Sequence, residues 1–176
     1  MSEPLPLLID TDPGVDDALA LLMAFRSRRH RLLGLCITAG NVGLPHTVAN
    51  ALKLCEVAGI DLPVYPGCDR PLVFAAEDAS YVHGRDGFGD VGYTPAGRPP
   101  EAEHAALAIV RLAREHEGSL LLVTLGPLTN LALALRLDPG LPARIGRLVV
   151  MGGAVTGKGN TSIGAEFNFA FDPEAA

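Results

Sequence analysis

Hydrophobic residues in this chain form short uninterrupted runs that alternate with longer segments of helical periodicity. The uninterrupted runs are typical of strands buried on both faces, and they fall at 5–9, 32–38, 63–65, 120–124 and 148–151. Apolar positions at helical spacing predict helices at 17–25, 47–57, 101–115 and 128–137. This alternation predicts an α/β fold whose mostly parallel sheet is flanked by helices on both faces.

Polar and glycine-rich turns follow most of the predicted strands. Gly40-Asn41 comes after the second strand, Leu125-Gly126 after the fourth, and Gly152 after the fifth. In open α/β sheets, binding sites form beyond the carboxyl ends of the strands. We therefore expect these turns to share one rim with the acidic run DTDPGVDD, which follows the first strand.

That acidic run holds four carboxylates within eight residues: Asp10, Asp12, Asp16 and Asp17. Carboxylates this close repel each other unless a cation or a helix N-terminus lies nearby. Two acids that cap a helix would account for Asp16 and Asp17 alone, but not for Asp10 and Asp12. The whole run predicts a site for a hard divalent cation, which prefers oxygen ligands.

The segment 67–100 has no apolar period and contains five glycines after His83, at positions 84, 87, 89, 92 and 97. A connection this long inside a compact domain is typical of a functional loop. We expect a mobile flap that brings His83 to the rim. From the pattern alone, a hydrogen-bonded structural histidine is an equal alternative.

Composition excludes several classes of partner. A chain of 176 residues with 48% hydrophobic content can bury one core, so we expect a single domain over 1–176. A net charge of -6 and a pI near 5.3 argue against nucleic acid and anionic membranes as partners. The N-terminus lacks the features of a secretion signal, and no apolar run could span a bilayer, which predicts a cytoplasmic protein.

Five spaced motifs together resemble the nucleoside hydrolases, the inosine-uridine preferring N-ribohydrolase family. DTDPGVDDA resembles the N-terminal signature of that family, and the other motifs follow in the family's order. They are Thr38 to Val42, His83-Gly84 with Gly87 and Gly89, Gly126 to Asn130, and Met151-Gly152-Gly153 followed by Asn160 and by Ala165 to Asn168. The resemblance implies a Rossmann-like nucleoside hydrolase core.

The resemblance also implies an activity, a calcium-dependent hydrolysis of the N-glycosidic bond of ribonucleosides that yields ribose and free base. Asp12 would bind Ca²⁺ and act as the base, and Asp17 and the main-chain carbonyl of Leu125 would complete the calcium ligands of this chain. Asp10 would orient the loop. The residues implied to bind the small-molecule ribonucleoside are Asp16, Asn41, His83, Asn160, Glu166 and Asn168. The family also implies a homo-oligomer.

The family's chains are well over half as long again, and their C-terminal part supplies another aspartate to the calcium and a neighbouring histidine. The expected fold is therefore a C-terminally truncated one, whether from a fragment, a frame-shifted gene or a naturally shortened protein. One alternative is an inactive or weakly active calcium- and ribose-binding remnant. Another is a haloacid dehalogenase-like phosphohydrolase, suggested by Asp10-x-Asp12 but lacking a matching lysine motif. Purine and pyrimidine nucleosides both stay open as substrates.

Overall fold

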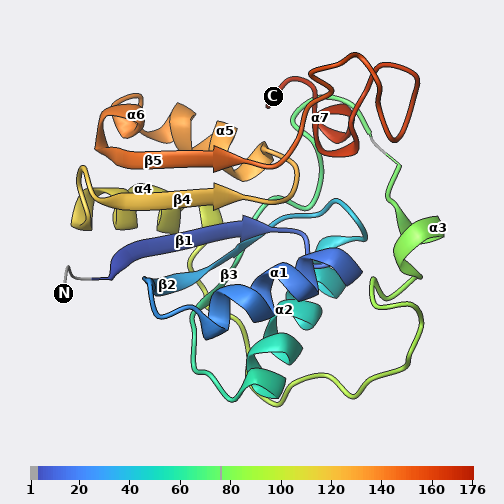
Figure 1. Ribbon diagram of the computed structural model, residues 1–176, viewed down its shortest axis with the longest axis horizontal. Coiled ribbons are helices and arrows are strands. Elements are labelled where there is room, and N and C mark those ends of the chain that lie inside the picture. Colours follow the sequence, from blue (N-terminus) through green and yellow to red (C-terminus); the bar gives the residue numbers. More distant parts are fainter. Residues whose placement is uncertain (1–3, 76) are drawn as a thin grey trace.

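The computed structural model describes residues 4–75 and 77–176 and confirms the predicted α/β architecture. Five parallel strands form one sheet in the order β3-β2-β1-β4-β5 (Figure 1). The strands are β1 (Leu5–Thr11), β2 (His30–Ile37), β3 (Val64–Pro66), β4 (Leu120–Thr124) and β5 (Ile145–Val150). Since all of them run in the same direction, their carboxyl ends meet at one rim.

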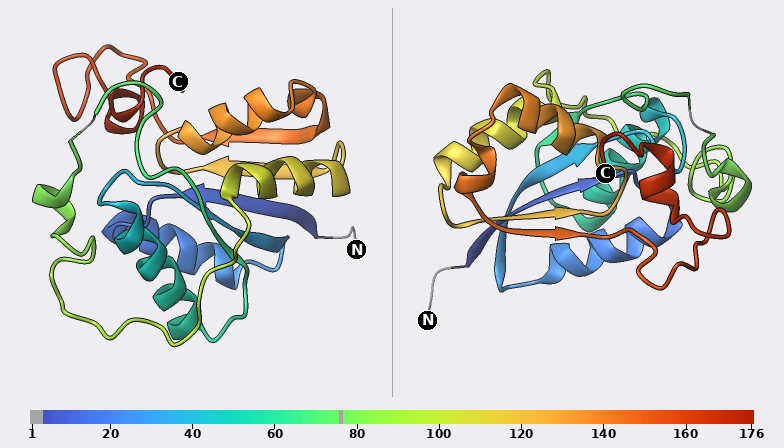
Figure 2. Two further views of the ribbon diagram at one scale, coloured as in Figure 1. Left: turned by 180° about the vertical axis from the view of Figure 1, so that it is seen from behind. Right: turned by 90° about the horizontal axis from the view of Figure 1, so that it is seen from above.

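Helices cover both faces of this sheet, as expected. α1 (Val15–Arg26) and α2 (Leu44–Ala58) pack on one face, and α4 (Ala105–Glu115) and α5 (Thr129–Leu137) pack on the other (Figure 2). Alternate residues of β1 supply the two cores: Leu8 faces the helices α4 and α5, whereas Leu7 and Ile9 face α1 and α2. Burial on both faces is why β1 has no polar residue before Asp10.

The sequence analysis did not predict three short helices: α3 (Ser80–His83), α6 (Leu141–Arg144) and α7 (Phe167–Phe171). Each has four or five residues, which is too short for a hydrophobic period to show. The predicted helix at 101–115 also begins later, at Ala105. The side chain of His104 accepts a hydrogen bond from the backbone N–H of Ala106 at 3.1 Å and so caps the first turn.

The expected burial of the fifth strand on both faces is wrong. β5 is the edge of the sheet, and Leu148, Val149 and Val150 are 36–46% exposed. An apolar run indicates a strand, but it does not show whether another element covers it. Within residues 4–75 and 77–176, no helix is long and apolar enough to cross a membrane.

The order of the strands makes two loops diverge at the rim, the one after β1 and the one after β4. From β1 the chain moves to β2 and β3 on one side of the sheet, and then returns to place β4 on the other side of β1. The loops after β1 and β4 therefore diverge, and α/β proteins bind ligands in the crevice at such a switch point. Asp12 follows β1 and Leu125 follows β4.

We expect Leu8→Ala to lower the free energy of unfolding by about 2–5 kcal/mol, because it leaves a cavity beneath α4. Leu8 is fully buried in the core shared by β1 and α4. Leu19→Ala on α1 is the matched control: its side chain is 65% exposed, so the loss should stay under about 0.5 kcal/mol. Urea unfolding of both variants measures the difference, and equal losses would contradict the assigned core.

Candidate functional site

One cavity of about 270 Å³ opens at the carboxyl ends of the strands. It is lined by side chains that the sequence places in five separate motifs, more than 150 residues apart at the extremes. All nine predicted site residues are among them: Asp12, Asp16, Asp17, Asn41, His83, Leu125, Asn160, Glu166 and Asn168. The sequence analysis therefore identified residues that the fold brings together.

Two buried carboxylates form the floor of this cavity. Asp12 follows the end of β1, and Asp17 lies in the first turn of α1; their residues are 1% and 6% exposed. Thr11 Oγ1 donates to Asp17 Oδ1 at 2.6 Å, and the N–H of Gly14 donates to Asp17 Oδ2 at 3.1 Å. The turn thus folds back on its own helix, which fixes the direction of the Asp17 side chain.

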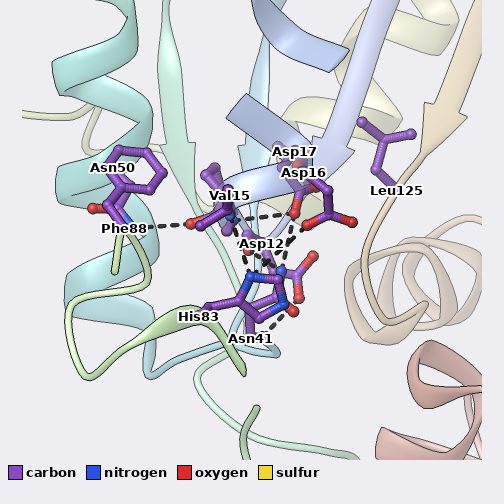
Figure 3. Close-up of polar contacts among 12 residues, drawn as sticks. Asp12, Val15, Asp16, Asp17, Asn41, Asn50, His83, Phe88 and Leu125 are labelled. Atoms are coloured by element: carbon purple, nitrogen blue, oxygen red, sulfur yellow. Dashed lines mark hydrogen bonds and ion pairs between the residues drawn. The ribbon is translucent and has the colours of Figure 1, made fainter. Parts of the chain in front are cut away.

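Asn41 joins the two carboxylates (Figure 3). Its backbone N–H donates to Asp12 Oδ2 at 2.7 Å, and its side-chain amide donates both to the Asp12 carbonyl and to Asp17 Oδ2, each at 2.9 Å. Asn41 is 7% exposed and comes from the turn after β2. A residue from a neighbouring strand end therefore holds both acids in one arrangement.

Glycines give the Asp12 carboxylate its space. A Cβ atom at Gly40 would lie 2.1 Å from Asp12 Oδ2, and one at Gly126 would lie 2.4 Å from Asp12 Oδ1. Both distances are shorter than any real Cβ contact, so any other residue would displace the carboxylate. The turns after β2 and β4 clamp Asp12 from two sides.

The burial of these acids opposes their negative charge. Burial raises the pKa of Asp12 well above its ordinary value, and the nearby charge of Asp17 raises it further. Burial also raises the pKa of Asp17, although the hydrogen bond from Thr11 acts in the opposite direction. A cation bound between them would favour the charged form of both groups.

The opposite wall comes from the chain beyond β5 and from the turn after β4. Glu166 caps α7 by accepting from the N–H of Asn168 at 3.1 Å, and it also accepts from the N–H of Gly153 at 3.0 Å. The amide of Asn168 donates to the main-chain carbonyl of Leu125 at 2.7 Å. A carbonyl oxygen has two lone pairs, so that of Leu125 can accept another contact.

The remaining predicted residues lie nearer the solvent. Asp16 is exposed, and its Oδ1 lies 3.9 Å from Nδ1 of His83. The same His83 nitrogen accepts a hydrogen bond from the N–H of Val15 at 3.3 Å, which leaves Nε2 as the N–H donor of a neutral ring. Asn160 Oδ1 accepts from the N–H of Phe167 at 2.8 Å and holds its loop against α7.

Six further residues line the cavity and were not named as site residues in the sequence analysis: Ala79, Tyr81, Val82, Met151, Thr161 and Phe167. Most carry no chemistry that a motif search would select. The sequence signal that could have identified them is their position beside predicted site residues. Tyr81 and Val82 directly precede His83, and Phe167 lies between Glu166 and Asn168. They add apolar and aromatic surface above a polar floor, an arrangement that suits a small organic molecule.

Asp10 points away from the cavity into the α4 and α5 side of the sheet. Its Oδ1 accepts from the amide of Asn130 at 2.8 Å, and Asn130 in turn accepts from the N–H of Cys68 at 2.8 Å. Burial raises the pKa of Asp10 to about 7, although the Asn130 bond lowers it. This geometry fits the expected orienting role rather than a ligand role.

No group of three or more His, Cys, Asp or Glu side chains in the described part of the chain is placed to hold a metal ion. Asp12 and Asp17 are a pair, and any further ligand would be a backbone carbonyl, an amide, water or a substrate oxygen. Hard cations take such oxygens readily.

Comparisons with known proteins match nearly all of this chain. A family model described as inosine-uridine preferring nucleoside hydrolase matches residues 7–176. Uridine nucleosidase 1 of Arabidopsis thaliana is 42% identical over 172 residues, which make up 97% of this chain and 51% of that protein.

Solved structures agree with this match. A plant nucleoside hydrolase, the PpNRh1 enzyme, superposes with a TM-score of 0.94 at 39% identity, over 98% of this chain and 55% of its own. A purine-preferring ribonucleoside hydrolase from Gardnerella vaginalis gives 0.93 at 36% identity, over 97% and 56%. The chain spans about half the length of the relatives it matches.

The raised pKa of Asp10 predicts a pH-dependent stability. A carboxyl whose pKa rises from 3.8 to about 7 on folding stabilises the fold fully below pH 3.8, and this contribution is lost as the pH rises through about 7. In calcium-free buffer we expect wild type to lose on the order of 4 kcal/mol more than Asp10→Asn between acidic pH and pH 8. Urea unfolding across this range measures it. Equal losses in the two proteins would contradict a buried neutral Asp10.

Proposed function

This chain belongs to the inosine-uridine preferring nucleoside hydrolase family, and we propose that it hydrolyses the N-glycosidic bond of ribonucleosides to ribose and free base. One observation carries the proposal. Two buried carboxylates, Asp12 and Asp17, are joined by Asn41 at the floor of a cavity whose other wall offers a carboxylate and an amide. The hydroxyls of a ribose could form hydrogen bonds with that wall. A water molecule held at the floor could attack the anomeric carbon of the ribose.

We further propose that the floor binds Ca²⁺ through Asp12, Asp17 and the main-chain carbonyl of Leu125. The fit is supported by the donor set, which is all oxygen, and by the glycines that shape the space around Asp12. It is also supported by the direction of the pKa of both acids, since burial without a cation penalises their charge. When bound, the ion would lower the pKa of a water molecule and neutralise the two carboxylates.

Asp12 has the geometry of the base in this proposal. The backbone N–H of Asn41 donates to Oδ2 of Asp12, and the carboxylate lies between the turns after β2 and β4 in the lining of the cavity. Asp12 would take a proton from the attacking water while positive charge builds on the ribose ring. Asn41 would keep the carboxylate aimed at that water, since its backbone N–H donates to Oδ2 and its side-chain amide holds the Asp12 carbonyl.

The ribose would be held by side chains from both sides of the cavity. Asp16 presents an exposed carboxylate next to His83, and Glu166 and Asn168 present an acceptor and an amide from α7. Asn41 and Asn160 also line the space. Hydroxyls donate and accept, so a mixed array of carboxylates and amides can fix their orientation. His83 and the apolar residues before it would face the base.

The two alternatives from the sequence analysis differ in how well the comparisons support them. The haloacid dehalogenase-like alternative is not supported, because the family model and the matched structures are nucleoside hydrolases over nearly the whole chain. A calcium- and ribose-binding protein with little turnover is the second candidate, since the chain spans about half the length of its relatives. Binding without release would distinguish it.

We expect Asp12→Asn to lower ribose release from inosine or uridine by about a hundredfold or more, because an amide cannot take the proton. Reducing-sugar assays with Ca²⁺ and with a chelator measure this. Asp61→Asn is the matched control: its side chain is 96% exposed and lies away from the cavity, so its rate should equal wild type. Unchanged turnover in Asp12→Asn would show that Asp12 is not the base. No release by wild type, with calcium-dependent thermal stabilisation retained, would favour the binding protein.

We expect Gly126→Ala to weaken calcium binding by roughly tenfold or more, since its Cβ would push against Asp12 Oδ1. The melting temperature as a function of Ca²⁺ concentration measures the affinity. Gly97→Ala is the control, because a Cβ there meets nothing within 4 Å. Equal calcium titration curves for the two variants would exclude Asp12 as a ligand.

A further inference from the structure

Asn50 is a fully buried polar residue on α2 and is not among the residues that line the cavity. Burying an amide is unfavourable unless each of its polar atoms finds a partner. The partners of Asn50 come from two segments that both reach the cavity. One is the carboxylate turn, residues 10–17, and the other is the His83 loop, residues 79–93.

The amide of Asn50 bridges these two segments. Its nitrogen donates to the carbonyl of Pro13 and to the carbonyl of Asp86, each at 2.9 Å. The hydroxyl of Tyr93 donates to Asn50 Oδ1, which fixes the side of the amide that faces the two carbonyls. Pro13 directly follows Asp12, and Asp86 comes three residues after His83.

Close packing accompanies this bridge. A Cβ at Gly87 would lie 2.7 Å from the Asn50 nitrogen, and the φ of Gly87 is +81°, so the loop needs glycine there on both grounds. The two segments meet again where the N–H of Val15 donates to His83 Nδ1 at 3.3 Å. The His83 loop is therefore attached to the carboxylate turn both directly, through His83, and through Asn50, which supplies the buried attachment.

We propose that Asn50 is a positioning residue that holds the His83 loop against the carboxylate turn and so sets the width of the substrate cavity. This inference rests on the proposed function. Only an amide fits the position, because one atom must donate to two carbonyls while its neighbour accepts from a hydroxyl. An aspartate of the same shape would present an oxygen to both carbonyls and would repel them.

The consequence is specific to substrate binding. Ala79, Tyr81, Val82 and His83 line the cavity and belong to the loop that Asn50 holds. Asp12, in contrast, keeps its own hydrogen bonds to Asn41. Loss of the bridge should weaken ground-state binding more than it slows the chemical step, which raises KM and leaves kcat nearly unchanged.

The test compares Asn50→Asp with Thr47→Val on the same helix. Thr47 is also fully buried, but its hydroxyl donates to the backbone carbonyls of Thr38 at 3.0 Å and Leu44 at 3.1 Å, which belong to neither segment. We expect Asn50→Asp to raise KM roughly tenfold with kcat within about threefold of wild type, and Thr47→Val to change neither. Tyr93→Phe, which removes only the bond that orients the amide, should raise KM by an intermediate amount.

A second measurement does not depend on activity. Amide hydrogen exchange in residues 79–93 should accelerate in Asn50→Asp but not in Thr47→Val. If both variants change KM and exchange alike, Asn50 is merely a buried stabilising residue and the proposal is wrong. If wild type releases no ribose, the proposed function fails, and the exchange comparison alone then supports or overturns the bridge.

Discussion

The site is governed by one constraint, which is that two carboxylates are buried beside each other at the end of a parallel sheet. Asp12 and Asp17 face one cavity, and the burial of each raises its pKa. Backbone N–H groups and the amide of Asn41 offset part of this cost, and a cation would offset the rest. The surrounding turns and glycines hold these two carboxylates in place.

The sheet supplies that support through its topology. The strand order makes the loops after β1 and β4 diverge, so that Asp12 from one loop and Leu125 from the other line the same cavity at the switch point. The turn after β2 adds Asn41, and the segment after β5 returns with Glu166 and Asn168. The His83 loop closes the remaining side, attached through Asn50 and Val15. Each wall of the cavity thus begins at a different strand end.

Sequence reasoning reached the parallel sheet because apolar runs mark the strands. It reached nine of the fifteen residues that line the cavity because polar turns follow those strands and because the motifs there resemble those of a known family. It failed where burial depends on distant partners. β5 was expected to be covered, yet its exposure depends on whether another element packs on it. Asn50 was missed because its partners lie 37 and 36 residues away and a single polar residue on a helix is unremarkable. Calcium, a cytoplasmic location and self-association remain predictions.

The most direct test of this account is a crystal structure of the protein grown with Ca²⁺. The account predicts one calcium peak at the floor of the cavity, with oxygens of both Asp12 and Asp17 among its ligands. A structure in which the ion binds elsewhere, or in which the two carboxylates turn away from each other with no ion between them, would contradict it.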